Sequence, residues 1–279
     1  MTLKLMYITN EPEVALIAEK AGVDRIFVDL EYIGKNDRQS GMDSVKSDHT
    51  MEDVKKIRKK LTKAEMLVRC NPIHEATENY GSSEEEINEI IENGADIVML
   101  PYFKTVEEAK RFLKCVDNRT KTLLLVETPE AVEILDELLQ LENIDEIFIG
   151  LNDLSLGYGK DFMFELLADG TVEKICMKCK EANITYGFGG IASLGKGKLE
   201  SENVIVEHYR LGSNSVILSR SFCDIKQMEN LIEVDEVFTR GVTEIREYEE
   251  YCKSQELSFF NKNKEVVKRK VEAICGELR

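Results

Sequence analysis

Two carboxylic acids, Glu127 and Asp153, occupy positions where parallel α/β proteins place catalytic groups. Each follows a short apolar run, in LLLVETPEAV (123–132) and IFIGLNDLSLG (147–157). We expect these runs to be buried parallel strands, which places both acids at strand carboxyl ends, one strand–helix–strand step apart (153 − 127 = 26 residues). Two such acids repel each other unless a cation joins them, and hard oxygen ligands suit Mg²⁺, with Mn²⁺ or Co²⁺ as substitutes. The pair therefore predicts a divalent-metal site.

Other polar residues follow the remaining predicted strands and indicate the ligand. Arg69 offers a planar fork that can hold a carboxylate through two bonds. Beside a cation, that fork suits a 2-oxo acid, whose carboxylate and keto oxygens would chelate the metal while the cation stabilises an enolate. Gly150 and its neighbours would present backbone N–H groups to the substrate carboxylate, and we place Asn152 and Pro101 in the same substrate pocket.

Asp29 and Glu31 alternate to the same side of one predicted strand, where we expect them to orient Arg69 or metal-bound water. Structural alternatives stay open at this point. Arg69 could be only an ion-pair partner of Asp29 or Glu31. Glu127 and Asp153 also stand in contexts, TPE and NDLS, that fit helix N-caps.

The elements that would position these residues repeat regularly along the chain. Apolar runs, mostly continuous as in strands covered on both faces, alternate with amphipathic stretches that carry acids in their first turn. The predicted strands are 3–9, 25–31, 65–71, 96–102, 121–127, 146–152, 185–190 and 215–221. The predicted helices between them include 12–22, 50–61, 83–95, 105–116 and 129–141.

Eight such steps predict a (β/α)8 TIM barrel, an α/β fold whose catalytic groups gather at strand carboxyl ends. A doubly wound open sheet is the rival, but no glycine-rich dinucleotide turn follows the first strand. Residues 1–224 would form the catalytic barrel and 225–279 a C-terminal helical extension, with a break near Ser258–Asn263. A long polar loop, 32–49, follows the second strand on the face expected to hold the site.

Composition limits the partners. The chain has 279 residues, 43% of them hydrophobic, and a formal net charge of −16. That charge argues against nucleic acid or an anionic membrane, since both are polyanions, and the 32% of charged residues argue against a membrane span. Seven scattered cysteines and an N-terminus without signal-peptide character lead us to expect a cytoplasmic protein with reduced thiols.

At these residues the chain resembles the HpcH/HpaI aldolase and citrate lyase β-subunit family, over roughly residues 1–224. The segments that carry the resemblance are DLE (29–31), VRCNP (68–72), GADIVMLP (94–101), ETPEAV (127–132) and IGLNDLS (149–155). The resemblance implies that Glu127 and Asp153 hold Mg²⁺ or a similar metal and that Arg69 binds the substrate carboxylate. It also implies a TIM barrel that forms a homo-oligomer by exchanging its last helix.

One position departs from the family. Its 2-oxo acid aldolases usually have a histidine as catalytic base after the DxE segment, citrate-lyase-like members commonly carry an acid, and this chain has Tyr32. A tyrosine with an ordinary pKa near 10 is a poor base at neutral pH. His49, in the polar loop, or His74, after the third strand, would have to replace it.

Four further features have mainly structural interpretations. Cys176 and Cys179 share a helical stretch without a second pair or a histidine, which argues against zinc or redox chemistry. The GKGK segment (195–198) lacks Walker spacing, but its lysines could meet an anionic substrate tail. His208 is expected to be structural, and Arg220 is a weaker candidate for ligand contact.

The leading hypothesis is a metal-dependent carbon–carbon lyase, an aldolase acting on a small 2-oxo acid through a pyruvate-type enolate. A citrate-lyase-like enzyme that cleaves or forms a 3-hydroxyacyl-CoA is the second hypothesis. The third is a barrel that has lost catalysis and serves in binding or assembly.

Overall fold

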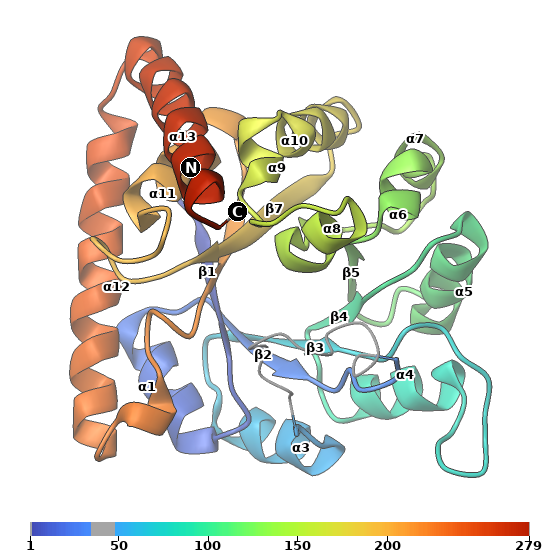
Figure 1. Cartoon of the computed structure of the whole chain (residues 1–279). Coiled ribbons are helices and arrows are strands. Elements are labelled where there is room, and N and C mark those ends of the chain that lie inside the picture. Colours follow the sequence, from blue (N-terminus) through green and yellow to red (C-terminus); the bar gives the residue numbers. More distant parts are fainter. Residues whose placement is uncertain (1, 35–47, 279) are drawn as a thin grey trace.

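Eight parallel strands close into a barrel in the computed structural model, which describes residues 2–34 and 48–278 (Figure 1). Each strand pairs with its sequence neighbours, and β8 returns to β1. The strands are β1 (Lys4–Ile8), β2 (Arg25–Asp29), β3 (Glu65–Arg69), β4 (Ile97–Leu100), β5 (Lys121–Val126), β6 (Glu146–Ile149), β7 (Thr185–Ile191) and β8 (Ser215–Leu218). The predicted TIM barrel and all eight of its strands are confirmed.

The helices surround the barrel and connect its strands (Figure 1). They are α1 (Pro12–Ala21), α3 (Met51–Lys60), α4 (Ser83–Glu92), α5 (Val106–Val116), α6 (Pro129–Glu133), α7 (Leu135–Leu138), α8 (Leu151–Gly157), α9 (Glu165–Ala168), α10 (Thr171–Glu181), α11 (Ser201–Leu211), α12 (Leu231–Lys253) and α13 (Leu257–Leu278), with a 3-10 turn, η1 (Ile225–Gln227). The helix predicted over 129–141 is divided at Ile134 into α6 and α7.

Alternation along the strands determines what the barrel interior contains. Side chains two residues apart share a face, so one set of alternate positions points inward. These inward positions form a small apolar core that is separate from the larger core under the helices. Its buried members are Met6, Phe27, Leu67, Ile97, Met99, Leu123, Leu125 and Phe148. This apolar core fills the middle of the barrel and separates its two ends.

The amino-terminal end of the barrel is closed by a buried ion-pair network. Arg25, fully buried, donates from Nη1 to Glu146 at 2.7 Å, pairs with it again through Nη2, and donates from Nε to Glu65 at 2.8 Å. Lys121 binds the same Glu65 at 2.6 Å. Polar residues at this end of the inner face therefore serve structure, while those at the opposite end are available for chemistry.

The C-terminal helices pack on the barrel of the same chain. α12 contacts α1 and α11, the place of an eighth barrel helix, and α13 contacts α9 and α11 (Figure 1). The predicted helical extension is confirmed, but the break expected near Ser258–Asn263 is wrong. It falls at 254–256, because the polar residues of 258–263 are accommodated inside α13, where Asn263 is buried and hydrogen-bonded.

Three further expectations concern the polar loop after β2, membrane-spanning helices and the domain boundary. The polar loop predicted over 32–49 lies largely outside the described residues, since 35–47 are not described. Within the described part of the chain, no helix combines the length and apolar character needed to cross a bilayer. The boundary between residues 224 and 225 stays a prediction.

Candidate active site

Arg69 forms the centre of a charged cluster at the carboxyl end of the barrel. Asp29 and Arg69 are register partners on β2 and β3, which places them side by side. Arg69 donates to Asp29 through Nε and Nη2, each at 2.8 Å, and Nη2 lies 3.3 Å from Glu31 Oε2. Both acids are almost fully buried. Burial opposes the charge of Arg69, but Asp29 and Glu31 keep its pKa well above the usual value, so the guanidinium stays protonated.

Glu127 is buried beside this cluster. Its Oε1 accepts the backbone N–H of Tyr102 at 2.9 Å. Burial, together with the charges of Glu31 and Asp153, raises its pKa to about 8, and Arg69 opposes that shift. Asp153 thus acts electrostatically on Glu127. That the two acids hold one cation stays a prediction.

The helix-cap alternative for Glu127 and Asp153 does not describe their position. Thr128 caps α6, its Oγ1 accepting the Ala131 N–H at 3.1 Å. The N-cap of α8 is Gly150, without a side-chain cap, and Asp153 lies within the first turn. Neither acid is therefore used as a cap.

Gly150 acts through the absence of a side chain. A Cβ at this position would lie 2.8 Å from Glu127 Cβ and 2.9 Å from its Oε2, closer than real Cβ contacts. Its own N–H is donated to Val126 O at 3.0 Å and is used within the fold, while the contact of the neighbouring N–H groups with a substrate carboxylate stays a prediction. Gly150 instead leaves the space that the Glu127 carboxylate occupies.

The other predicted substrate contacts lie around this cluster. Asn152 is exposed in the first turn of α8, with its Nδ2 3.5 Å from Asp153 Oδ1. Pro101 is buried and directly precedes Tyr102. Sequence reasoning missed Tyr102, whose left-handed backbone (φ 47°) directs its N–H at Glu127. No sequence signal marks such a conformation in a tyrosine, where it costs about 1–3 kcal/mol.

The donor set fits a hard divalent cation of the Mg²⁺ type. Arg69 interacts electrostatically with three carboxylates, those of Asp29, Glu31 and Glu127, a formal balance of 1 − 3 = −2 when all three are ionised. Asp153 acts in turn on Glu127. Among the described residues, no group of three or more His, Cys, Asp or Glu side chains is arranged to hold a metal. Two carboxylates, with water and substrate oxygens completing the shell, are the usual protein share of a Mg²⁺ site, whereas structural zinc needs four protein ligands.

The candidates for the catalytic base are not poised as bases. Tyr32 is 53% exposed. The partial burial of its hydroxyl, together with the charges of Glu86 and Tyr80, raises its pKa, which makes it a still poorer base. His49 accepts the Asp29 N–H through Nδ1 at 2.9 Å. A backbone N–H can only donate, so neutral His49 carries its proton on Nε2 and must release Asp29 before it can accept another.

His74, the second replacement considered, belongs to the loop between β3 and α4. Its ring nitrogens lie 2.8 Å from Pro72 O and 3.0 Å from Gly81 O. It lines, together with Tyr32 and His49, a cavity of about 370 Å³ between the ends of β2 and β3 and helix α4. This cavity adjoins the charged cluster through the segment that begins at Asp29.

The remaining motifs behave as structural features. His208 is fully buried, stacks on Phe188 and bonds Ser213 Oγ through Nδ1 at 2.8 Å. Cys176 and Cys179 are buried in α10, and burial raises the pKa of both thiols, that of Cys179 to about 12, which makes them unreactive.

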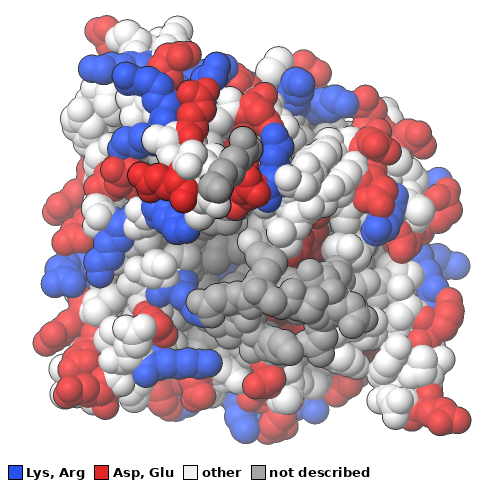
Figure 2. Space-filling view, in the orientation of Figure 1, with Lys and Arg blue, Asp and Glu red and all other residues white. Residues whose placement is uncertain are grey.

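The charged surface does not single out a polyanion partner. Arg220 and the GKGK segment (195–198) are exposed. Figure 2 shows acidic and basic side chains interspersed over the described part of this face, rather than a continuous basic patch.

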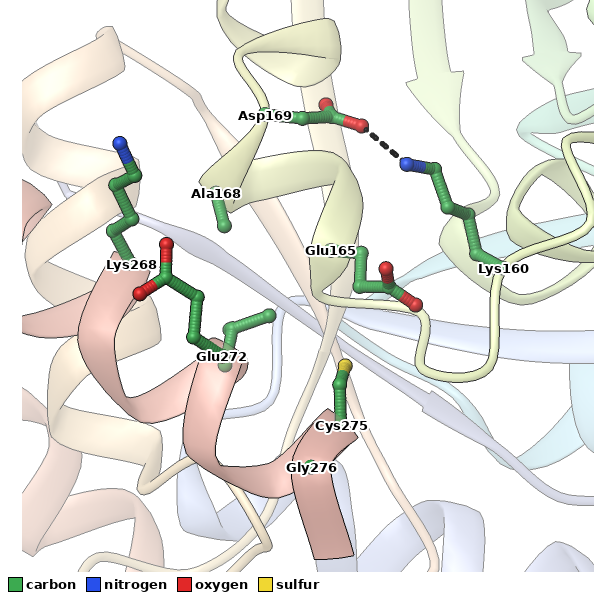
Figure 3. A pocket seen from close by; sticks show the side chains of 9 residues that line it. Lys160, Glu165, Ala168, Asp169, Lys268, Glu272, Cys275 and Gly276 are labelled. Atoms are coloured by element: carbon green, nitrogen blue, oxygen red, sulfur yellow. Dashed lines mark ion pairs between the residues drawn. The ribbon is translucent and has the colours of Figure 1, made fainter. Parts of the chain in front are cut away.

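A second cavity, of about 350 Å³, lies between α13 and the segment that includes α9 (Figure 3). It contains none of the predicted site residues. Its charged lining is partly neutralised by the pair between Lys160 and Asp169 at 3.1 Å, drawn as a dashed line in Figure 3. The charged cluster at the barrel mouth is therefore the better candidate for an active site.

The fold and the cluster define an acid-rich TIM barrel, and comparison with known proteins gives the family. The sequence profile of HpcH/HpaI aldolase/citrate lyase matches residues 4–192, more than half of the chain. The chain therefore belongs to this family of lyases. The match ends short of residue 224, where the resemblance was expected to end. No curated protein matches the chain.

Solved structures of the same kind confirm the fold. An HpcH/HpaI aldolase/citrate lyase family protein from Burkholderia cenocepacia J2315 is 13% identical, with a TM-score of 0.60, covering 84% of this chain and 95% of its own. The HpcH/HpaI aldolase from Desulfitobacterium hafniense DCB-2 is 15% identical, with a TM-score of 0.60, covering 88% and 93%. Citrate synthase SbnG is 14% identical, with a TM-score of 0.60, covering 84% and 94%.

Proposed function

We propose that this protein is a divalent-metal-dependent carbon–carbon lyase that acts on a small 2-oxo acid through a pyruvate-type enolate. The observation that carries the proposal is the meeting of a buried Glu127, influenced by Asp153, with a guanidinium held in place by two further acids. Family membership supports the class of reaction. The substrate and the metal are our inference from the charges.

Arg69 is preorganised to bind the substrate carboxylate. Asp29 holds it in a two-bond pair through Nε and Nη2, which fixes the plane of the guanidinium and directs Nη1 as the nitrogen for a substrate. Glu31 adds a contact at 3.3 Å. The pairing expected from the sequence as a structural alternative thus orients the guanidinium, but Asp29 and Glu31 occupy Nε and Nη2, so a substrate carboxylate would meet Nη1 alone rather than a two-bond fork.

Glu127 and Asp153 would hold the cation, and Gly150 gives Glu127 the room to do so. When bound, the metal supplies Lewis acidity at the keto oxygen, which favours the enolate. The Tyr102 N–H fixes one oxygen of Glu127, so the other is the one proposed for the metal. His49, whose neutral form carries its proton on Nε2, would donate rather than accept a proton in such a site.

The proposal predicts that Glu127→Gln lowers activity by about 100-fold or more, because an uncharged amide holds the cation less well and the enolate loses the positive charge that stabilises it. The assays are oxaloacetate decarboxylation and pyruvate release from 4-hydroxy-2-oxo acids, with Mg²⁺, with Mn²⁺ and after chelation. Chelation is expected to abolish turnover, and added metal to restore it.

The matched control is Glu130→Gln, three residues along the chain. Glu130 is partly exposed and pairs with Lys104 at 2.8 Å, outside the cluster, so its loss is expected to leave turnover unchanged. Absence of turnover of every such compound, with wild type indistinguishable from Glu127→Gln, would contradict the proposal and favour a barrel without catalysis. Calorimetric binding of acetyl-CoA would instead support the thioester alternative.

A small-molecule substrate, a homo-oligomeric state and a cytoplasmic location complete the proposal. All seven cysteines are free, which is compatible with a reducing compartment.

A further inference from the structure

The segment from Asp29 to Ile33 contains three of the residues proposed for catalysis, and its backbone is held from both sides. The Leu30 N–H is donated to Arg69 O at 3.0 Å, and Asp29 binds His49 as described. Beyond these bonds, the N–H groups of Tyr32 and Ile33 are both donated to Oδ1 of Asn71, each at 2.9 Å. One side chain from the next strand-end loop therefore orients this segment.

The amide of Asn71 is fully used. Its Oδ1 accepts the two N–H groups, while its Nδ2 donates to Leu30 O at 3.3 Å and to Glu86 Oε1 at 2.9 Å. These partners fix the orientation of the amide, because a reversed amide would place donors against donors and oxygen against oxygen. Asn71 is only 2% exposed, so water is a poor substitute for these bonds.

The carboxylate of Glu86, on α4, accepts hydrogen bonds from both the side chain and the backbone of Asn71. Besides the bond to Nδ2, it accepts the Asn71 backbone N–H at 3.1 Å through Oε1 and at 3.3 Å through Oε2. Burial raises the pKa of Glu86, and the bonds from Asn71 oppose that effect. A partly buried carboxylate that is directed at one amide, rather than at solvent, serves to orient that amide.

We propose that Asn71, oriented by Glu86, is a positioning residue that sets the placement of the Asp29–Ile33 segment and thereby of Glu31 against Arg69. As a claim about catalysis, this inference rests on the proposed function. Neither Asn71 nor Glu86 touches the reacting atoms; they act by fixing the loop that contains Glu31 and Tyr32. Rotation of the amide would release three bonds to the backbone of this segment at once, those with the N–H groups of Tyr32 and Ile33 and with Leu30 O.

The test exchanges the direction of one hydrogen bond. Asn71→Asp retains an oxygen for Tyr32 and Ile33 but sets a carboxylate against Glu86. Adding Glu86→Gln allows the new amide to donate to the carboxylate introduced at position 71, while its oxygen accepts the backbone N–H of the same position, and the net charge returns to that of the wild type. The double variant is therefore expected to recover the contact between positions 71 and 86, while the bond to Leu30 O, which an aspartate cannot donate, stays lost.

Two measurements are made on each variant. Amide hydrogen exchange of peptides that cover residues 29–34 reports on positioning without any substrate. The kcat and KM of the 2-oxo acid reaction report on its consequence. We expect Asn71→Asp to accelerate exchange and to lower kcat about 10- to 100-fold with a smaller change in KM. We expect Asn71→Asp with Glu86→Gln to restore most of both.

The matched control is Asn71→Asp combined with Glu89→Gln. Glu89 lines the same cavity on the same helix but pairs with Lys55 at 3.7 Å, so this variant restores the net charge without restoring the contact. It is expected to behave like Asn71→Asp alone. Rescue by Glu89→Gln, or additive losses with Glu86→Gln, would overturn the proposal.

The two proposals can fail separately. In one outcome, the double variant regains protection from hydrogen exchange, but the wild type turns over no 2-oxo acid. That outcome would support the positioning role and contradict the proposed function. Turnover by the wild type, with no coupling between positions 71 and 86, would contradict the positioning role alone. If Asn71→Asp does not fold, Glu86→Gln alone is expected to show faster exchange and a smaller loss of kcat, and an unchanged result would overturn the inference.

Discussion

At the scale of single residues, the clearest physical contrast is between Glu127 and His208, two buried titratable groups. Glu127 has negative neighbours and a pKa raised to about 8, an electrostatic cost that a cation would remove. His208 has no charged group among the causes of its shift, and burial alone lowers its pKa to about 3. The first arrangement is typical of a functional site, and the second of a packed core.

The burial of His208 predicts that the unfolding free energy of the protein falls as the pH is lowered. Its pKa falls from an ordinary 6.5 to about 3 on folding, so the unfolded chain binds more protons between these values. Its contribution to stability is therefore present above about pH 6.5 and is lost as the pH falls. From about pH 6.5 to 4.5 the loss is about 2 kcal/mol of unfolding free energy.

Urea unfolding at a series of pH values, for wild type and His208→Gln, measures this contribution. The variant is expected to be less stable at neutral pH, because the stacking on Phe188 is lost, but its stability should decline less on acidification. Parallel pH dependences of the two proteins would refute the assignment.

At the scale of elements, alternation within strands places opposite functions at the two ends of the same inner face. On β2 the inward series is Arg25, Phe27 and Asp29, with a basic residue at the closed end and an acid at the open end. On β3 the series Glu65, Leu67 and Arg69 has the reverse order of charge. Neighbouring strands therefore form ion pairs at both ends, with apolar residues between them.

The closed end yields a prediction about stability. Arg25→Met is expected to lower the unfolding free energy by about 3–5 kcal/mol, because Glu146 would remain buried without its partner. Replacing both residues, as Arg25→Met with Glu146→Leu, is expected to cost less than Arg25→Met alone, since no uncompensated charge stays buried. Denaturant unfolding measures both.

Arg58→Met is the control for this prediction. Arg58 pairs with Asp96 at 2.8 Å in a partly exposed position, and we expect a change of about 1 kcal/mol or less. An Arg25→Met protein as stable as Arg58→Met would show that the buried network contributes little.

At the scale of the whole molecule, the question is which barrel α13 covers. Its polar contacts are specific: Asn263 donates to Glu207 at 2.9 Å, Lys264 to Glu173 at 2.7 Å and Lys270 to Glu200 at 2.8 Å. In the structure these contacts join α13 to its own chain. The exchange of the last helix between subunits, implied by the family resemblance, stays a prediction that these contacts make testable.

Zero-length carbodiimide cross-linking of a mixture of light and heavy isotope-labelled chains distinguishes the two arrangements. With α13 on its own barrel, the Lys264–Glu173 cross-link joins only peptides of equal label, because both partners belong to one chain. Co-refolding the mixture before the reaction allows subunits to exchange. Peptides of mixed label, detected by mass spectrometry, would show that α13 reaches a neighbouring barrel.

Much of this architecture followed from local patterns. Eight apolar runs at regular spacing predicted the barrel, and this prediction is confirmed because strand burial depends on neighbouring sequence. The metal site predicted at Glu127 and Asp153 stays a prediction, and Asp153 lies in the first turn of α8 rather than directly after β6. The helix break expected at Ser258–Asn263 failed because a polar residue can be buried when a distant helix supplies its partner, as Glu207 does for Asn263.

By itself, then, the sequence determined the class of fold, the segments that become strands and the identity of the charged residues. Only the tertiary structure decided how those charges are shared: that Asp29 and Glu31 hold Arg69, that Tyr102 and Gly150 shape the surroundings of Glu127, and that Glu86 reaches Asn71. The physical reason is that hydrogen bonds and ion pairs depend on distances of a few ångströms between residues far apart in the chain. Sequence spacing gives the strand on which a side chain lies, and packing determines its partner.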